Sequence, residues 1–369
     1  MLFKGTTQRS AFDIAAAIDS VGGVLNASTG KELTSFYVKV PDYHLPLAIE
    51  LLADILRNAL FDPLEMEKEK SVVLQEIRLM EDTPDDFIHE FFSSVFWNGH
   101  PLGRPVLGTG ETVSGFQRDV LLDFFQERYR GDRLVLTAAG NLKHEELLTL
   151  VSRAFGSMAI SADEAPPEIA PVPQSAIGLL DKDLEQVHLL MGSVSHPFSS
   201  PTRYAAFLMN TVLGGSMSSR LFQEIREKRG LAYSVHSYVA SYRDTGLFGI
   251  YAGTSAENVR EILDVVSTEC HRLKTEVLTD LELFAAKEQI KGHLLLSMES
   301  TDHRMTRLAK NEIYLHRHLP PEETVANIEE VTKENIQELA CDLFKRETTS
   351  IAALGKVAGE VIHRDMLRF

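Results

Sequence analysis

The chain has 369 residues, of which 44% are apolar and 24% are charged, and its formal net charge is −16. The length predicts two or three domains, and the composition is typical of packed domains rather than disorder. The acidic excess argues against nucleic acid or an anionic membrane as a partner, because both bind cationic surfaces. No apolar run reaches the roughly 18 residues of a membrane span. Two cysteines, Cys270 and Cys341, exclude a disulfide framework and a C-x-x-C site.

A proline-rich segment divides the chain. Residues 161–175, SADEAPPEIAPVPQS, contain four of the 14 prolines and no sustained apolar periodicity. Proline at this density favours an extended linker over a helix or a strand. The sequence therefore predicts an N-terminal domain over 1–160, a linker over 161–175 and a C-terminal domain over 176–369.

In the first half, Ile14, Ile18 and Val21 recur at helical spacing, and the Gly-Gly pair after them predicts the end of a helix. Two strands are expected next, in VLNAST and in LTSFYVKV, where apolar and polar residues alternate. A helix over 45–56 and a long helix over 63–80 follow. This half closes with a helix and an apolar strand, LVLTAAGN.

The second half repeats that order. A helix over 207–213 ends at a Gly-Gly pair, and the strands YSVHSYVASY and GLFGIYAGT, a helix over 257–273 and a closing strand SIAALGKV follow. One constant offset aligns the later parts, pairing Asp62 with Asp280, Met80 with Met298, His100 with His318 and Val113 with Val331. The pattern indicates an internal duplication. It predicts an α+β fold of two homologous domains, each a mainly antiparallel sheet with helices packed on one face.

Two glutamates on the helix over 63–80 are candidates for chemistry. Glu69 and Glu76 lie two turns apart on one helix face. A solvated acidic face would explain them, but the repeat places Lys287 and Leu294 at the corresponding positions, so the duplicated helix forms without either carboxylate. The apolar neighbours of Glu76 predict that it is more buried than a surface glutamate. A buried carboxylate needs a cation or hydrogen-bond donors.

The segment from 214 to 237 contains a second candidate pair, Arg226 and Tyr233, on either side of a Lys-Arg-Gly turn. Arginine offers fixed donors to a carbonyl or carboxylate, and a tyrosine hydroxyl can donate to a developing oxyanion. A helix end with exposed basic side chains is the alternative explanation of this segment.

Taken together, these segments resemble the pitrilysin-like inverted zinc metallopeptidases, in particular their processing-peptidase-like branch. The resemblance rests on five pieces in the family's order: MLFKGT at the start, GGVLNAST with ELTSFYV, EKEKSVVLQEI, GHPLGRPVLGT and SSRLFQEIREKRGLAYSV. They span essentially the whole chain. The family's duplicated α+β domains agree with the repeat.

The resemblance implies a Zn²⁺ cofactor bound by two histidines of an H-x-x-E-H helix and by a glutamate further along the chain. The glutamate within H-x-x-E-H then acts as general base. The downstream ligand matches Glu76, and Glu69 matches a second acidic residue that supports the site. His100 lies in a family-typical loop, although its counterpart His318 in the repeat makes a structural role equally reasonable.

The resemblance also implies where a peptide substrate binds. Substrate adds as a strand to a sheet edge in this family, and the matching edge consists of Asn26, Ala27, Ser28 and Thr29. Arg226 and Tyr233 match the pair that holds the substrate backbone and stabilises the tetrahedral intermediate.

One departure from the family pattern is severe. Neither H-x-x-E-H nor H-E-x-x-H occurs in the 369 residues, whereas the family carries its motif immediately before the segment that matches MLFKGT. His316 and His318 form the closest histidine pair, and on a predicted helix they would point in two directions at the surface. One carboxylate cannot hold zinc, because a catalytic site normally has three protein ligands.

Three hypotheses are compatible with this pattern. The gene product is a zinc endopeptidase whose start was placed at an internal methionine, so that the 369 residues alone are inactive. Alternatively, it is a non-catalytic subunit that binds peptides or an active partner, or a truncated product that exposes apolar surface and an open sheet edge. As an enzyme, it would form half of a chamber between domains, completed by a homodimer or a homologous subunit, and would accept peptides or unfolded segments. The sequence leaves the compartment open.

Overall fold

The computed structural model describes residues 1–160, 170–173, 175–357, 362–363 and 366. The described chain forms two compact units, and each is presented by itself. The first contains Met1–Leu79, 106–160 and Ser300–Ala309. The second contains Met80–Pro105 and the other described residues from 170 onward. The expected linker, 161–175, lies mostly outside the described residues.

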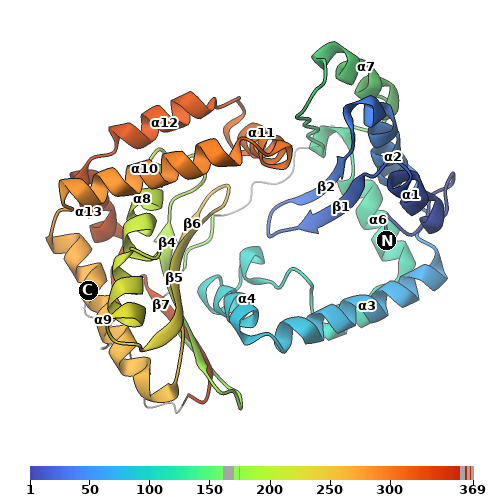
Figure 1. Ribbon diagram of the computed structural model, residues 1–369. Helices are drawn as coiled ribbons and strands as arrows, with labels where there is room; N and C mark the ends of the chain where they lie inside the picture. The colour runs from blue at the N-terminus through green and yellow to red at the C-terminus, as the bar shows by residue number, and fades with distance from the viewer. Residues whose placement is uncertain (161–169, 174, 358–361, 364–365, 367–369) are drawn as a thin grey trace. The chain divides into compact units, whose positions relative to one another are not determined.

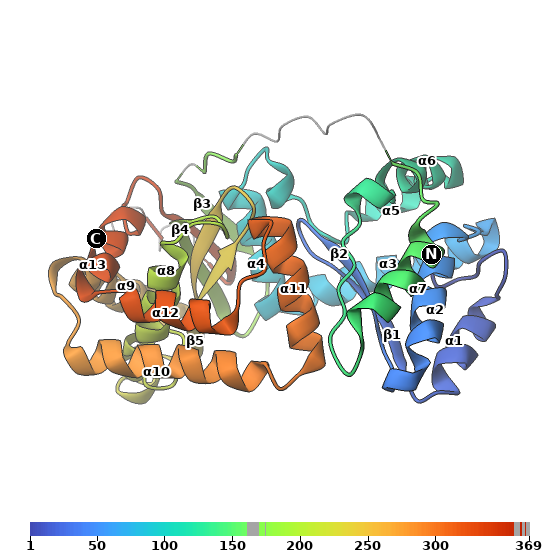
Figure 2. The ribbon, with the colours of Figure 1, turned by 90° about the horizontal axis from the view of Figure 1, so that it is seen from above.

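The first unit contains one antiparallel strand pair and six helices of the described chain (Figure 1). Asn26 of β1 lies opposite Tyr37 of β2. Figure 2 shows α1 and α2 beside this pair, in agreement with the contacts of α1 with β1 and of α2 with β2. The elements are α1 (Ala11–Asp19), β1 (Val24–Thr29), β2 (Thr34–Lys39), α2 (Leu45–Arg57), α3 (Pro63–Glu81), α5 (Gly110–Gly115), α6 (Arg118–Arg128) and α7 (His144–Phe155).

Local sequence explains how these elements begin and end. The Ser10 side chain accepts a hydrogen bond from the Asp13 amide, and the Asp13 carboxylate accepts one from the Ser10 amide, so α1 begins with a capping box. Gly22 after α1 has a φ of 64°, a conformation that glycine adopts without steric cost. The apolar faces of these helices meet in a small core that includes Ile14 and Ile55.

The strand expected in LVLTAAGN is wrong. Residues 134–139 contain no strand, and the β1–β2 pair is the whole of the first unit's sheet among the described residues. A strand forms only where a neighbour accepts its backbone hydrogen bonds, and no described strand pairs with this segment. The Thr137 hydroxyl instead donates to the Met305 carbonyl at 3.1 Å, which ties the segment to the helix α11 (Thr301–Leu315).

The second unit is built on a five-stranded sheet in the order β3-β7-β4-β6-β5. The β3–β7 pair is parallel and the other three pairs are antiparallel. The strands are β3 (Ile177–Asp181), β4 (Val187–Ser195), β5 (Ala232–Ser241), β6 (Gly246–Thr254) and β7 (Ser350–Gly355). The helices are α4 (Pro84–Phe96), α8 (Arg203–Leu213), α9 (Val259–Thr275), α10 (Asp280–Ser297), α11 (Thr301–Leu315, shared with the first unit), α12 (Pro321–Glu330) and α13 (Lys333–Leu343).

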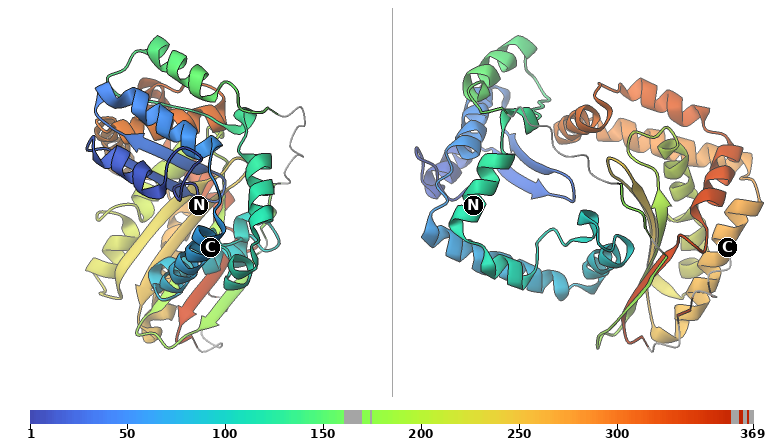
Figure 3. Two further views of the ribbon diagram at one scale, coloured as in Figure 1. Left: turned by 90° about the vertical axis from the view of Figure 1, so that its right-hand side faces the viewer. Right: turned by 180° about the vertical axis from the view of Figure 1, so that it is seen from behind.

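Both faces of this sheet are covered by helices (Figure 3, right). Because strand side chains alternate, Leu189 and Met191 pack into the core formed with α8, α9 and α13. Leu190 between them packs into a second core with α4. Because both faces are covered, eight of the nine residues of β4 are buried, including His188, Ser193 and Ser195.

The α+β class predicted from the sequence is confirmed, and α4 adds a feature that the repeat does not predict. This helix comes from the first half of the chain, yet its aromatic side chains pack against the second unit's sheet. A Cβ on Gly192 of β4 would lie 2.5 Å from Cζ of Phe92, so only glycine allows the ring to approach this closely. The compact units place Met80–Pro105 with the second half of the chain, whereas the sequence predicts this segment in an N-terminal domain over 1–160. That domain stays a prediction, since it rests on the internal repeat.

None of the helices in the described part of the chain is long and apolar enough to cross a membrane.

Candidate active site

Glu69 of α3 is engaged by cations at the start of the chain. Its Oε1 lies 2.8 Å from Nζ of Lys4, and its Oε2 lies 3.9 Å from the amino group of Met1. The hydrogen bond to Glu69 is the main cause of a raised pKa for Lys4. Burial lowers the pKa of the Met1 amine, and the Glu69 charge partly offsets this effect. Glu69 is therefore ion-paired with the segment 1–6.

Glu76 lies two turns further along α3 and is exposed, so the expectation that it is buried is wrong. The reason is that little covers this helix. Met66 is its only buried residue among those described, and the apolar Leu79 is 69% exposed. No group of three or more His, Cys, Asp or Glu side chains in the described residues could hold a metal ion. The described residues therefore do not fit zinc by themselves, and Glu76 contributes one accessible carboxylate.

Strand β1 offers an open sheet edge in the first unit. It pairs with β2 on one side, and no other described strand pairs with it. The side chains of Asn26, Ser28 and Thr29 are exposed, whereas that of Ala27 is half-buried. The Asn26 side-chain oxygen accepts a hydrogen bond from the Ala27 amide at 2.8 Å. An edge of this kind can accept an added peptide strand through backbone hydrogen bonds.

Arg226 and Tyr233 lie against each other in the second unit. The Arg226 guanidinium carbon lies 4.4 Å from the centroid of the Tyr233 ring and 4.8 Å from that of Phe222. Contacts of this kind are attractive, because the ring face is electron-rich. Tyr233 is 76% exposed, so its hydroxyl is available to a ligand.

Two irregularities of the backbone produce this pair. Arg226 lies on a π-helix, Phe222–Glu227, and the register of β5 with β6 shifts between Ala232 and Ser234, where Tyr233 is the extra residue of a bulge. A bulge redirects a side chain out of the regular strand pattern, and both π-helices and bulges are frequent at functional sites. Neither irregularity has a sequence signal that the periodicity of the segment would reveal.

The remaining histidine candidates have structural surroundings. The His100 Nδ1 accepts a hydrogen bond from the Leu102 amide at 3.2 Å and caps the short helix Pro101–Gly103. His316 and His318 are both exposed, as expected. The expected helix position of this pair is wrong, because α11 ends at Leu315 and His316 has a φ of 52°.

Sequence reasoning missed a cluster of aromatic and histidine side chains between α4 and the sheet. His89 Nδ1 lies 3.1 Å from the Tyr238 hydroxyl, and the His236 ring lies 5.0 Å from that of Tyr251. Burial lowers the pKa of both histidines, and for His89 the neighbouring His236 lowers it further. The alternation of His236 and Tyr238 on β5 was the available signal. It could not reveal the partner on α4.

Comparisons with known proteins agree with this architecture. The family model described as Insulinase (Peptidase family M16) matches residues 1–110, and the one described as Peptidase M16 inactive domain matches residues 115–290. An uncharacterized zinc protease of Bacillus subtilis, YmxG, is 40% identical over 94% of this chain and 84% of its own length. An uncharacterized zinc protease of Streptomyces coelicolor is 38% identical over 96% of this chain and 79% of its own.

Two solved structures share the fold. A protease from Helicobacter pylori has a TM-score of 0.88 at 20% identity, covering 96% of this chain and 86% of that one. A peptidase M16 inactive domain from Pseudomonas fluorescens has a TM-score of 0.82 at 21% identity, covering 97% and 87%. These structures show that the chain has the α+β fold of M16 peptidase structures. The chain belongs to peptidase family M16, and its sequence relatives are named zinc proteases.

Proposed function

We propose that this chain is the greater part of a zinc-dependent endopeptidase of the processing-peptidase-like type, which hydrolyses peptides or unfolded segments. The observation that carries the proposal is the Arg226–Tyr233 pair. A π-helix and a bulge hold a cation against an exposed phenol, and both irregularities are frequent at functional sites. The names of the sequence relatives support the same reaction class.

Each candidate residue has a role in this proposal. Glu76 supplies one zinc ligand, and Glu69 supports the site from the same helix. The two histidine ligands and the general base come from an H-x-x-E-H motif that precedes the 369 residues in the gene product. The open edge of β1, at 26–29, pairs with the substrate backbone. Arg226 and Tyr233 bind substrate carbonyl groups, and the tyrosine hydroxyl donates to the oxyanion that forms during hydrolysis.

The test of the zinc ligand uses a protein extended upstream to include H-x-x-E-H. In Glu76→Gln, we expect loss of both peptide hydrolysis and stoichiometric zinc, measured by a fluorogenic peptide and by elemental analysis. Glu67→Gln is the matched control, because Glu67 is an exposed glutamate on the same helix, paired with Lys70. Unchanged hydrolysis in Glu76→Gln would overturn the assignment.

The test of the second unit's pair uses Tyr233→Phe in the same extended protein. Loss of one oxyanion donor costs about 10²–10³ in kcat, and substrate affinity should change little. Because Tyr233 is mostly exposed, this substitution leaves the packing of the unit intact. An unchanged kcat would exclude the donor role.

A second candidate function is a non-catalytic subunit that binds peptides or an active partner. It is favoured by the absence of a metal-ligand cluster from the described residues and by a family model described as an inactive domain. Purification of the endogenous protein distinguishes the two. A chain of 41.2 kDa that co-purifies with an H-x-x-E-H protein would support the subunit. A longer chain, alone or as a homodimer, with its own motif would exclude it. The enclosing chamber stays a prediction of the family resemblance.

A further inference from the structure

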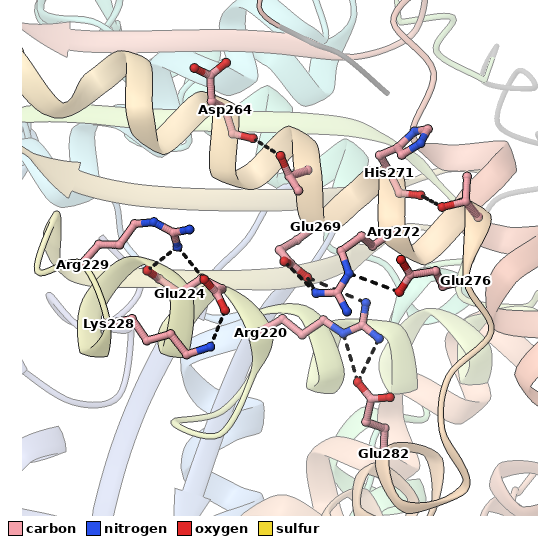
Figure 4. Close-up of polar contacts among 12 residues, drawn as sticks. Arg220, Glu224, Lys228, Arg229, Asp264, Glu269, His271, Arg272, Glu276 and Glu282 are labelled. Atoms are coloured by element: carbon pink, nitrogen blue, oxygen red, sulfur yellow. Dashed lines mark hydrogen bonds and ion pairs between the residues drawn. The ribbon is translucent and has the colours of Figure 1, made fainter.

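A nearly buried arginine holds the segment that presents Arg226. Arg220 precedes the π-helix, and its side chain is 11% exposed. Its Nε and Nη2 donate to Oε1 of Glu282 on α10, at 3.1 and 2.9 Å. Its Nη1 forms an ion pair with Oε2 of Glu269 on α9, at 3.8 Å. Figure 4 shows Arg220 between these two carboxylates, so one side chain joins the start of the π-helix to two long helices.

Both carboxylates are themselves fixed. The Glu282 Oε2 accepts hydrogen bonds from the amide and the hydroxyl of Thr279, which caps α10. Burial raises the pKa of Glu282, but these hydrogen bonds and those from Arg220 outweigh burial and lower the pKa. Glu269 has a side chain only 5% exposed and accepts two hydrogen bonds from Arg272, at 3.0 and 3.2 Å. Both partners of Arg220 are therefore held in place by hydrogen bonds to other residues.

The far end of the π-helix is held by a separate group of charges. The Glu224 carboxylate accepts hydrogen bonds from Lys228 and Arg229, and Arg229 also donates to the Glu224 carbonyl. These hydrogen bonds lower the pKa of Glu224. Figure 4 shows this group beside Arg220 and its partners. The interactions of Arg220 at one end and those of Glu224 at the other thus form two clamps on the turn that carries Arg226.

The backbone between the clamps has wide hydrogen-bonded turns. The Lys228 amide donates to the Gln223 carbonyl, and the Leu231 amide donates to the Ile225 carbonyl, both at 2.9 Å. Wide turns of this kind are rare, because their geometry is poorer than that of an α-helix, and they persist where surroundings hold them. Buried Ile225 fixes one face of the turn in the core, but an apolar contact does not set the rotation of its charged neighbours.

We propose that Arg220 is a positioning residue, which holds the π-helix in the conformation that places Arg226 against Tyr233. The inference rests on the proposed function, because it assigns the purpose of the clamp to the substrate-binding pair. Arg220 acts through Arg226 and does not itself contact substrate. The alternative is that Arg220 only joins α9 to α10.

The first arm of the test needs no catalysis and uses the 369-residue protein. In Arg220→Met, we expect the amides of Lys228 and Leu231 to exchange hydrogen at least about tenfold faster. Local unfolding of the segment then no longer has to break the interactions of Arg220 with Glu282 and Glu269. The Arg226 side-chain resonances, shifted by the Tyr233 ring, should move toward those of an exposed arginine. Unchanged exchange and unchanged resonances, with a lower Tm, would overturn the proposal.

Arg272→Met is the matched control. Arg272 donates to the same Glu269 and to Glu276 just beyond α9, so its side-chain hydrogen bonds lie at the C-terminal end of that helix. It should lower Tm and leave the exchange of the segment as it is; faster exchange in both variants would overturn the proposal. If Arg220→Met does not fold, Arg220→Lys replaces it. Lysine keeps the charge but lacks the forked donors of arginine, so faster exchange of the segment is again expected.

The second arm uses the extended protein and a peptide substrate. Arg220→Met should lower kcat about tenfold or more and leave KM within about twofold, because only the placement of the pair changes. Adding Arg220→Met to Arg226→Met should cost nothing further, since both remove the same interaction. Additive losses would overturn the proposal. If the extended wild type hydrolyses no peptide, the proposed function fails, and the exchange experiment still decides the positioning role.

Discussion

Removing the Phe92 ring should destabilise the second unit strongly. The ring is fully buried between α4 and the sheet, and it stacks on Phe96 with centroids 5.2 Å apart. Its edge fills the space above Gly192, where a Cβ would lie 2.5 Å away. In Phe92→Ala, we expect the free energy of unfolding to fall by about 3–5 kcal/mol, because apolar contacts are lost and a cavity remains.

The assay is urea unfolding followed by the fluorescence of Trp97, the only tryptophan of the chain. Trp97 is 2% exposed and belongs to the same core, with its ring 4.4 Å from that of Phe96, so its signal reports the second unit alone. Phe284→Ala on α10 is the matched control. Its ring is 62% exposed, so the same deletion should change the free energy of unfolding by no more than about 0.5 kcal/mol.

A double variant sharpens the test. Gly192→Ala alone should be destabilising, because its methyl group meets the Phe92 ring. With the ring absent, the methyl group enters the vacated space, so the double variant should lose about 1 kcal/mol less than the sum of the single variants. Leu247 also lies close, at 2.8 Å, which limits the recovery. Additive losses, or a loss below about 1 kcal/mol in Phe92→Ala, would refute the packing argument.

Three further predictions concern other sites. Burial lowers the pKa of His89 and His236, so the unfolded chain binds protons more readily than the folded one, and the free energy of unfolding should fall as pH decreases below about 6.5. Urea unfolding followed by Trp97 fluorescence at several pH values measures this. In a His89→Gln, His236→Gln double variant, the free energy of unfolding should depend less on pH. Asp54→Asn should destabilise the first unit by about 2 kcal/mol, because the buried carboxylate accepts three side-chain hydrogen bonds, and hydrogen exchange in α2 measures this loss. A thiol reagent should label one cysteine in the folded protein, the exposed Cys341, and a second only after unfolding; early labelling of buried Cys270, whose pKa burial raises, would contradict the core assignment.

Periodicity in the sequence determined the regular elements wherever one face meets a core. The strand expected in GLFGIYAGT is β6, and the helix expected over 63–80 is α3, which extends to Glu81. The segment from 214 to 237 also drew attention to Arg226 and Tyr233 on either side of a turn, and the family resemblance indicated them as a pair. These features depend on interactions between residues that are close along the chain, so a single sequence is enough to predict them.

Only the tertiary structure decided which surfaces are covered. The α4 helix packs on a sheet far along the sequence, Glu76 is exposed despite its apolar neighbours, and residues 134–139 are no strand because no described strand pairs with them. The clamp on Arg220 also joins residues from three separate segments. Burial and pairing are properties of two surfaces that meet, so a local pattern can indicate an apolar face or a candidate strand but cannot identify its partner.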